Sequence, residues 1–132
     1  MKKMKLSALV LAKNEQEMIE ACLKQLNFVD EIIVLDHNSN DKTPQIAKKY
    51  ADKVIKSSND NFGYNRNLLA QEAKGEWILF LDCDERLDGE NIQEINFFED
   101  PEMKTAISTR QLNVKGKRNP TNNFIYKNSG LW

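Results

Sequence analysis

An acidic cluster, Asp82-Cys83-Asp84-Glu85, directly follows the most apolar stretch of this 132-residue chain. Two carboxylates separated by one residue, at the end of a predicted strand, can both turn toward a single ion. Carboxylate oxygens suit Mg²⁺ or Mn²⁺, and these ions also bridge the phosphates of nucleotides. Asp82 and Asp84 are therefore predicted to hold Mg²⁺ or Mn²⁺. The alternative is a solvated strand end whose acids only cap the next element.

A second polar cluster follows another apolar run, which ends at Asp36. The small polar residues after it, 38–43, favour a tight turn that exposes backbone N–H groups. Such a turn can hold a base or a ribose by hydrogen bonds. The alternative is that Asp41 and Thr43 only cap the helix that Pro44 begins.

A third cluster covers residues 61–67 and contains Arg66 at the predicted opening of a helix. The guanidinium and the helix N-terminus can then face the same anion, such as a pyrophosphate. An arginine at a helix start is electrostatically less favoured than an acid, which indicates a specific partner. The ordinary alternative is a surface ion pair with Asp or Glu.

Four apolar runs are predicted to be strands, at residues 6–12, 31–36, 53–56 and 76–82. Because helical patterns separate them, they predict an α/β fold with a mostly parallel sheet. Right-handed crossovers place the carboxyl ends of these strands along one edge, where open α/β sheets bind ligands. Lys13-Asn14, Asp36 and Asp82 stand at that edge.

The predicted helices lie between these strands. Asn14 is expected to be the N-cap of the first, with Glu17 completing a capping box. The second follows Thr43-Pro44, and the third is expected over 64–74 with Gly75 as its terminator. Beyond residue 87 the pattern predicts a helix over 91–98, strands over 105–114 and 124–127, and a turn-rich loop over 116–123.

The order and spacing of the three clusters resemble the family 2 glycosyltransferases, particularly the branch related to lipopolysaccharide-core glucosyltransferases. The matching stretches cover residues 9–15, 30–43, 62–67 and 75–86. The resemblance implies a GT-A fold, with helices on both faces of a mostly parallel sheet. Compared with family members, the fold of this chain is expected to be truncated. It also implies a nucleotide diphosphate sugar, commonly a UDP-sugar, as the donor.

The resemblance assigns the donor site by position. Asp84 would hold the metal on the diphosphate, and Asp82 would lie near the metal and the ribose or donor sugar. Arg66 would lie close to the nucleotide. The full set of implied donor-binding residues is Ala12, Lys13, Asn14, Glu15, Asp36, His37, Asn38, Arg66, Asp82 and Cys83.

The sequence departs from the family pattern at three places. His37 stands where members often carry a second acid; it is the only histidine, and a polar residue at the rim is the expected role. Asn38 replaces a frequent glycine but tolerates left-handed backbone geometry, so the turn is expected to form. Residues 103–132 contain no Asp or Glu. No general base for the acceptor hydroxyl is therefore assigned, and the catalytic residues stay unknown.

Composition favours one domain over 1–132, divided in charge. Residues 1–102 hold 13 basic and 20 acidic residues and form the expected nucleotide-binding part, whereas 103–132 hold 6 basic residues and no acid. No aromatic–basic interleaving supports nucleic-acid binding. No apolar run approaches the ~20 residues of a membrane span. Cys22 and Cys83 offer no disulfide framework, so a cytoplasmic location is expected, with a peripheral position at the inner membrane face as the alternative.

The resemblance implies inverting transfer of a sugar to an unidentified glycan or other hydroxyl acceptor. Self-association or a partner subunit is a further expected interaction. The alternative is a nucleotide-sugar-binding module without turnover of its own. A sugar-phosphate nucleotidyltransferase or a dinucleotide-binding dehydrogenase needs a glycine-rich loop after the first strand. This chain has no glycine there, since residues 11–15 are Leu-Ala-Lys-Asn-Glu. Both classes of enzyme are therefore disfavoured.

Overall fold

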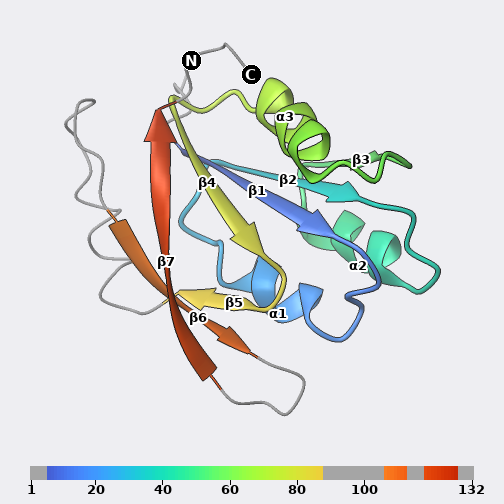
Figure 1. Ribbon diagram of the computed structural model, residues 1–132, viewed down its shortest axis with the longest axis horizontal. Helices are drawn as coiled ribbons and strands as arrows, with labels where there is room; N and C mark the ends of the chain where they lie inside the picture. The colour runs from blue at the N-terminus through green and yellow to red at the C-terminus, as the bar shows by residue number, and fades with distance from the viewer. Residues whose placement is uncertain (1–5, 88–105, 113–117, 128–132) are drawn as a thin grey trace.

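A computed structural model describes residues 6–87, 106–112 and 118–127 (Figure 1). Seven strands form one sheet in the order β3-β2-β1-β4-β7-β6-β5. The strands are β1 (Leu6–Ala12), β2 (Glu31–Asp36), β3 (Lys53–Lys56), β4 (Trp77–Asp82), β5 (Glu85–Leu87), β6 (Ala106–Leu112) and β7 (Arg118–Lys127). The helices are α1 (Ile19–Lys24), α2 (Thr43–Tyr50) and α3 (Phe62–Glu72).

The first four strands form the predicted parallel part of the sheet. β1 pairs in parallel with β2 and β4, and β2 pairs in parallel with β3. The register aligns Ala12 with Asp36 and Leu11 with Asp82. The polar residues that end β2 and β4 therefore lie within one residue of each other in register, on either side of the end of β1.

Helices cover both faces of this parallel part, and each face has its own apolar core. On one face, alternate residues of β1, including Ala8 and Val10, pack with Ile19 and Leu23 of α1. On the other face, Leu9 belongs to the cluster that contains residues of α3. Because β1 is buried on both faces, its sequence is apolar throughout instead of alternating with polar residues.

The other part of the sheet is antiparallel. β7 pairs with β4 and β6, and β6 pairs with β5. The strand predicted over 105–114 is confirmed, but the loop predicted over 116–123 is wrong from Arg118 onward. Asparagine and proline are disfavoured in strands, and here the ladder with β6 outweighs that preference. The helix predicted over 91–98 lies outside the described residues.

The helix boundaries correct two predictions. α1 begins at Ile19 and not after Asn14, because Asn14 has a left-handed φ of 52° and its side chain binds another loop. The predicted capping box is therefore wrong. α3 begins at Phe62, two residues early, because the Asn61 side chain accepts a hydrogen bond from the Tyr64 N–H (2.9 Å). None of the three described helices is long and apolar enough to cross a membrane.

Gly75, which joins α3 to β4, is expected to tolerate no side chain. Its N–H donates to Ser7 Oγ (2.9 Å), and a Cβ at this position would lie 2.6 Å from Ser7 Oγ and 2.8 Å from Ser7 N. Gly75→Ala is expected to lower the free energy of unfolding by about 2 kcal/mol, as measured in urea. The matched control is Gly63→Ala in α3, where the nearest atom lies 3.3 Å away. Its expected change is within about 1 kcal/mol, and equal losses in both variants would contradict the close-packing argument.

Candidate active site

The loops after β1 and β2 are joined by hydrogen bonds at the carboxyl edge of the sheet. The Asn14 N–H donates to Ser39 Oγ (2.8 Å), and the Asn40 N–H donates to Asn14 Oδ1 (2.7 Å). The Glu15 N–H donates to Thr43 Oγ1 (2.8 Å). These contacts hold the two loops as one unit at the carboxyl edge of the sheet.

The turn after β2 forms as predicted, with Asn38 in the left-handed region at a φ of 50°. Its N–H groups are nevertheless used inside the protein. Those of Asn40 and Lys42 bind side chains of the β1–α1 loop, and that of Thr43 binds Asp41 Oδ1 (2.9 Å). The prediction that the turn offers its N–H groups to a base is therefore wrong at these three positions. Of the alternative, in which Asp41 and Thr43 cap α2, only the contact of Asp41 with the first residue of the helix is confirmed, because the N-cap is Lys42 and the Thr43 hydroxyl accepts from the Glu15 N–H.

Asp36, at the end of β2, has a polar atom that is available to a ligand. Its side chain is 3% exposed, and its Oδ2 accepts a long hydrogen bond from the Ser39 N–H (3.4 Å). Its Oδ1 is buried and has no partner among the described residues. A buried carboxylate oxygen without a donor is costly. A ligand that brings an N–H or hydroxyl donor to this oxygen would remove that cost.

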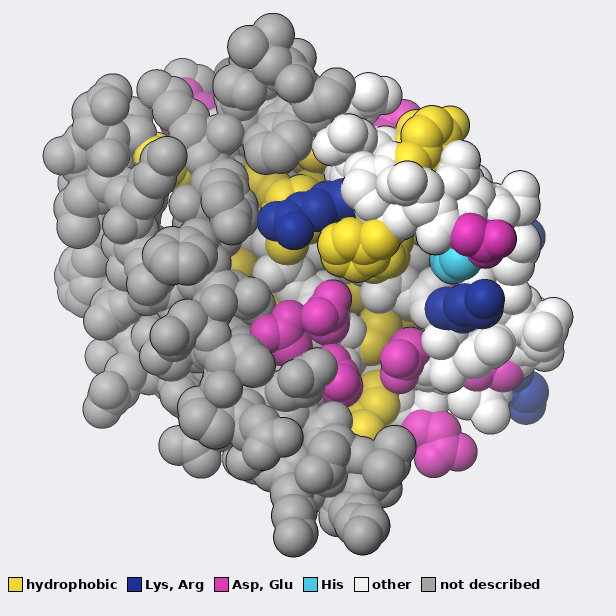
Figure 2. All heavy atoms as spheres, in the orientation of Figure 1, with side chains coloured by type: hydrophobic (Ala, Val, Ile, Leu, Met, Phe, Trp, Pro, Cys, Tyr) yellow, Lys and Arg dark blue, Asp and Glu magenta, His cyan; other side chains and the backbone are white. Residues whose placement is uncertain are grey.

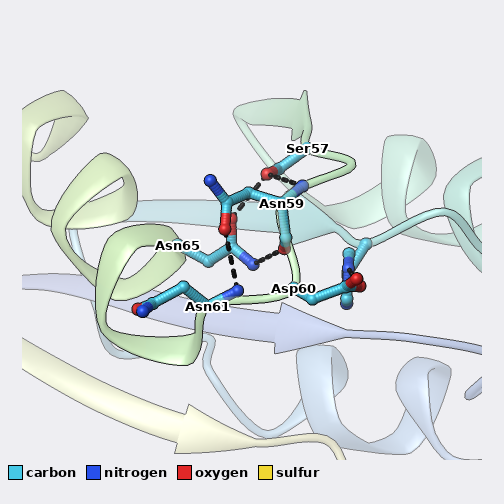
Figure 3. A network of polar contacts seen from close by, with 6 residues as sticks. Ser57, Asn59, Asp60, Asn61 and Asn65 are labelled. Atoms are coloured by element: carbon cyan, nitrogen blue, oxygen red, sulfur yellow. Dashed lines mark hydrogen bonds and ion pairs between the residues drawn. The ribbon is translucent and has the colours of Figure 1, made fainter.

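The loop between β3 and α3 is held by a network of polar side chains (Figure 3). Asn65, which is 1% exposed, accepts from Ser57 Oγ (2.5 Å) and donates from Nδ2 to the Asn59 carbonyl (2.7 Å). The Asn61 N–H donates to Asn59 Oδ1 (2.8 Å). The network fixes the start of α3 relative to the sheet edge.

His37 joins this loop to the end of β2. Its Nε2 lies 3.1 Å from Oδ1 of Asp60, whose side chain is almost fully exposed. His37 is thus a polar residue at the rim, in the position expected for it.

Arg66 faces the acidic end of β4 and not open solvent. Its Cζ lies 3.9 Å from the centre of the Phe80 ring, a cation–π contact. Phe80 and Asp82 are two residues apart in β4, so their side chains lie on the same face of the sheet. The charge of Arg66 also acts on Asp82, opposing the rise in its pKa. Arg66 is the fifth residue of α3, so the prediction that it opens the helix is wrong.

Carboxylates from the loops after β1, β2 and β4 gather at this edge of the sheet, and acidic side chains cluster over the ends of β1 and β4 (Figure 2). Burial of the carboxylate, followed by the charges of Glu85 and Asp84, raises the pKa of Asp82 to about 6. Asp82 is nevertheless exposed to solvent, which screens these charges. Burial also raises the pKa of Glu15, followed by the charges of Asp84 and Asp41. The five carboxylates of Glu15, Asp41, Asp82, Asp84 and Glu85 therefore interact as one acidic cluster.

This cluster fits a cation that arrives with its own ligands. The described part of the chain contains no group of three side chains placed to hold a metal ion. Mg²⁺ is commonly bound by one or two carboxylates and completed by substrate phosphates and water. Asp84 and Asp82 match that donor set, and an incoming cation would relieve the repulsion that raises the pKa of Asp82.

Comparison with known proteins identifies the family. Residues 7–128 match the profile described as Glycosyl transferase family 2. The chain belongs to this family. The family 2 relatives include the poly(ribitol-phosphate) β-N-acetylglucosaminyltransferase TarS of Staphylococcus aureus, 28% identical over 92% of this chain and 23% of TarS. The glycosyltransferase SunS of Bacillus subtilis is 37% identical over 62% of this chain and 20% of SunS.

Solved structures show that the family 2 chain has the predicted GT-A fold. The crystal structure of S. aureus TarS matches with a TM-score of 0.66 and 29% identity, over 78% of this chain and 21% of TarS. Glucosyl-3-phosphoglycerate synthase from Mycobacterium tuberculosis, in complex with Mn²⁺, UDP and its product, matches with a TM-score of 0.53 and 27% identity. That match covers 62% of this chain and 34% of the synthase. The chain thus spans about a fifth to a third of these proteins. None of the relatives named here is described as a lipopolysaccharide-core enzyme, so that branch stays a prediction.

Not every predicted site residue of the family 2 chain turns its side chain toward the acidic cluster. Cys83 is 2% exposed, and its Sγ donates to the Leu11 carbonyl (3.8 Å). Burial raises the pKa of its thiol, so it stays neutral. Ala12 is also buried, and its carbonyl already accepts from the His37 N–H (2.9 Å). The Cys83 side chain is therefore buried away from the edge, and the donor-binding role of this residue stays a prediction, whereas Lys13 is exposed at the edge.

In the metal-free protein, the raised pKa of Asp82 is expected to make stability depend on pH. The pKa is 3.8 for the free group and about 6 in the folded chain. The stability that this group contributes therefore falls as pH rises through that interval and stays low above it. At neutral pH, Asp82→Asn is expected to raise the free energy of unfolding by on the order of 1 kcal/mol, allowing for solvent screening.

Urea unfolding in EDTA at about pH 4 and at neutral pH measures this effect of Asp82. The stabilisation by Asp82→Asn should be small at the lower pH and appear at the higher one. A variant that is less stable than the wild type at neutral pH would show that the carboxylate is not under repulsion.

Proposed function

We propose that this chain forms the donor-binding part of a metal-dependent glycosyltransferase. The donor is a nucleotide diphosphate sugar, specifically a UDP-sugar, and the acceptor is a hydroxyl group of a glycan or another molecule. The observation that carries the proposal is the meeting of three unlike groups at one edge of the sheet. They are the buried oxygen of Asp36, the guanidinium of Arg66 and the carboxylates of Asp82 and Asp84.

These groups are spaced to match the parts of such a donor. β2 and β4 lie on either side of β1 in matched register, so the ends of β2 and β4 are about 10 Å apart. At the end of β2, Asp36 Oδ1 would accept a hydrogen bond from the base or the ribose. At the end of β4, Asp84 and Asp82 would face a metal-bound diphosphate, with Arg66 beside it.

The choice of UDP and Mn²⁺ is supported by a structural neighbour. The synthase from M. tuberculosis has been crystallised with Mn²⁺ and UDP, and also with Mn²⁺ and UDP-glucose. Its 27% identity to this chain supports the same donor class here. The proposal does not specify the sugar, since the synthase was crystallised with UDP-glucose and TarS is named for N-acetylglucosamine.

The residues of this chain support binding of the donor and stabilisation of the leaving group. A divalent cation at Asp84 would neutralise charge on the departing diphosphate. Arg66 would orient the diphosphate, and Asp36 would fix the nucleoside. Inverting transfer also requires a base for the acceptor hydroxyl, and residues 103–132 contain no Asp or Glu. The share of the reaction that we assign to this chain is therefore donor binding and stabilisation of the leaving diphosphate.

Calorimetric titration of UDP tests the proposal. In the presence of Mn²⁺ the wild-type chain is expected to bind UDP at least about 10-fold more tightly than in EDTA. UDP-glucose should show the same metal dependence, and ADP serves as the control for the base. Absence of UDP binding under both conditions would overturn the proposed donor.

The stacking of Arg66 on Phe80 is expected to contribute to UDP binding. Arg66→Ala should weaken binding about 10-fold or more, because it removes charge-assisted hydrogen bonds. Phe80→Leu should weaken it about 3-fold to 5-fold through loss of the cation–π contact. In the Arg66→Ala background, Phe80→Leu should have no further effect. Equal effects of Phe80→Leu in both backgrounds would show that the ring acts independently of Arg66.

A further inference from the structure

The turn that carries Asp84 is held at its edge by a side chain from the end of α1. Gln25 donates from Nε2 to the Glu85 carbonyl (2.9 Å) and accepts at Oε1 from the Leu87 N–H (2.8 Å). Its two hydrogen bonds match those that a neighbouring strand would make with residues two apart. β5 is the last strand of the sheet, so this one glutamine pairs with its outer edge.

Arg86 holds the same turn on its other side. Its Nη1 donates to the carbonyls of Cys83 (2.7 Å) and Glu85 (2.8 Å), and its Nη2 donates to the Met18 carbonyl (3.2 Å) at the start of α1. Only the forked guanidinium can reach three carbonyls at once in this way. Both ends of α1 are thereby connected to the turn, one through Arg86 and the other through Gln25.

A third contact closes the turn from within. The buried carboxylate of Glu85 accepts a hydrogen bond from the Asp82 N–H (2.8 Å). The backbone is therefore bound at Asp82, at Cys83 and at Glu85, and Asp84 lies between these fixed points. Since the positions on either side are bound, the direction of the Asp84 side chain is set by the turn.

We propose that Gln25 and Arg86 are positioning residues for the metal site. They fix the backbone of the turn so that Asp84 meets the ion in a single orientation. This inference rests on the proposed function, because the ion arrives with the diphosphate. Groups that orient a ligating carboxylate typically change metal affinity by 10-fold to 100-fold, roughly, when they are removed. Neither residue needs to contact the nucleotide.

UDP titrations of Gln25→Ala and Arg86→Lys, each with Mn²⁺ and with EDTA, test the assignment. Both variants are expected to bind UDP about 10-fold more weakly than the wild type in Mn²⁺ and equally well in EDTA. Arg86→Lys keeps the charge but loses the fork. The matched control is Gln45→Ala, which removes an exposed glutamine of α2 and should behave as the wild type under both conditions.

Hydrogen exchange supplies a readout that does not depend on the ligand. In Gln25→Ala, amides at 82–87 should exchange faster than in the wild type, while those of α2 and α3 stay unchanged. If Gln25→Ala does not fold, Gln25→Glu takes its place, since it keeps the acceptor for Leu87 and loses the donor to Glu85.

Two results would overturn the assignment while the wild type still binds UDP with Mn²⁺. One is wild-type affinity in Mn²⁺ for both folded variants. The other is an equal loss of affinity in Mn²⁺ and in EDTA, which would indicate a general structural role. Failure of the wild type itself to bind UDP would instead remove the proposed function.

Discussion

Replacing Asp84 with asparagine is expected to abolish the metal-dependent part of UDP binding. Asn has nearly the same shape as Asp but no charge, and Mg²⁺ and Mn²⁺ bind carboxylates much more strongly than amides. Affinity in Mn²⁺ should fall about 100-fold, to the value measured in EDTA. Affinity in EDTA should stay unchanged or rise slightly, because one negative charge no longer repels the diphosphate.

A charge control separates coordination by Asp84 from a change in overall electrostatics. Glu20→Gln removes one negative charge from the exposed face of α1. It should leave UDP affinity unchanged in Mn²⁺ and in EDTA, since exposed charges at a distance are largely screened. If Asp84→Asn kept the enhancement by Mn²⁺, the ion would bind elsewhere and the acidic cluster would need another explanation.

The parallel part of the sheet could be predicted because its physical signal is local. Strands buried on both faces need apolar side chains at every position, and β1, β2 and β4 show this in short unbroken runs. Their carboxyl ends then follow from right-handed crossovers. For this reason Asp36 and Asp82 could be placed at one edge from the sequence, and the register confirms that they end neighbouring rows of the sheet.

Features that depend on partners distant in the sequence could not be predicted. Asn14 is of a residue type that favours the N-cap position, but its side chain accepts a hydrogen bond from the N–H of Asn40, which is 26 residues away. Gln25 has no local signal for contact with β5, which is 60 residues further along the chain. β7 contains residues that disfavour strands, and its pairing with β6 supplies the ladder that overrides them.

Phe80 could have been found from the sequence with one further step. It lies two residues before Asp82, and alternation along a strand places both side chains on the same face. Since Arg66 was already expected near the nucleotide, an aromatic residue on that face was a candidate contact for its guanidinium. The stacking distance of 3.9 Å required the structure.

Asp36→Asn is expected to weaken UDP binding by about 10-fold to 100-fold, with the same loss in Mn²⁺ and in EDTA. Asp36 Oδ1 is a buried acceptor without a donor among the described residues, whereas an asparagine can place a donor NH₂ at the same position. Two donors would then face each other in a buried site. The equal loss under both conditions distinguishes the nucleoside end of the site from the metal end, where Asp84→Asn should act only in Mn²⁺.

The same Asp36→Asn substitution should leave the free protein as stable as the wild type or make it more stable, by about 1 kcal/mol in urea unfolding. The amide can keep the acceptor for the Ser39 N–H and no longer buries an unpaired charge. A higher free energy of unfolding combined with a lower affinity for UDP would show that Asp36 serves ligand binding and not stability. If binding and stability both fell, Asp36 would instead be a structural residue of the turn, and the nucleoside would have to be bound by other residues of this edge.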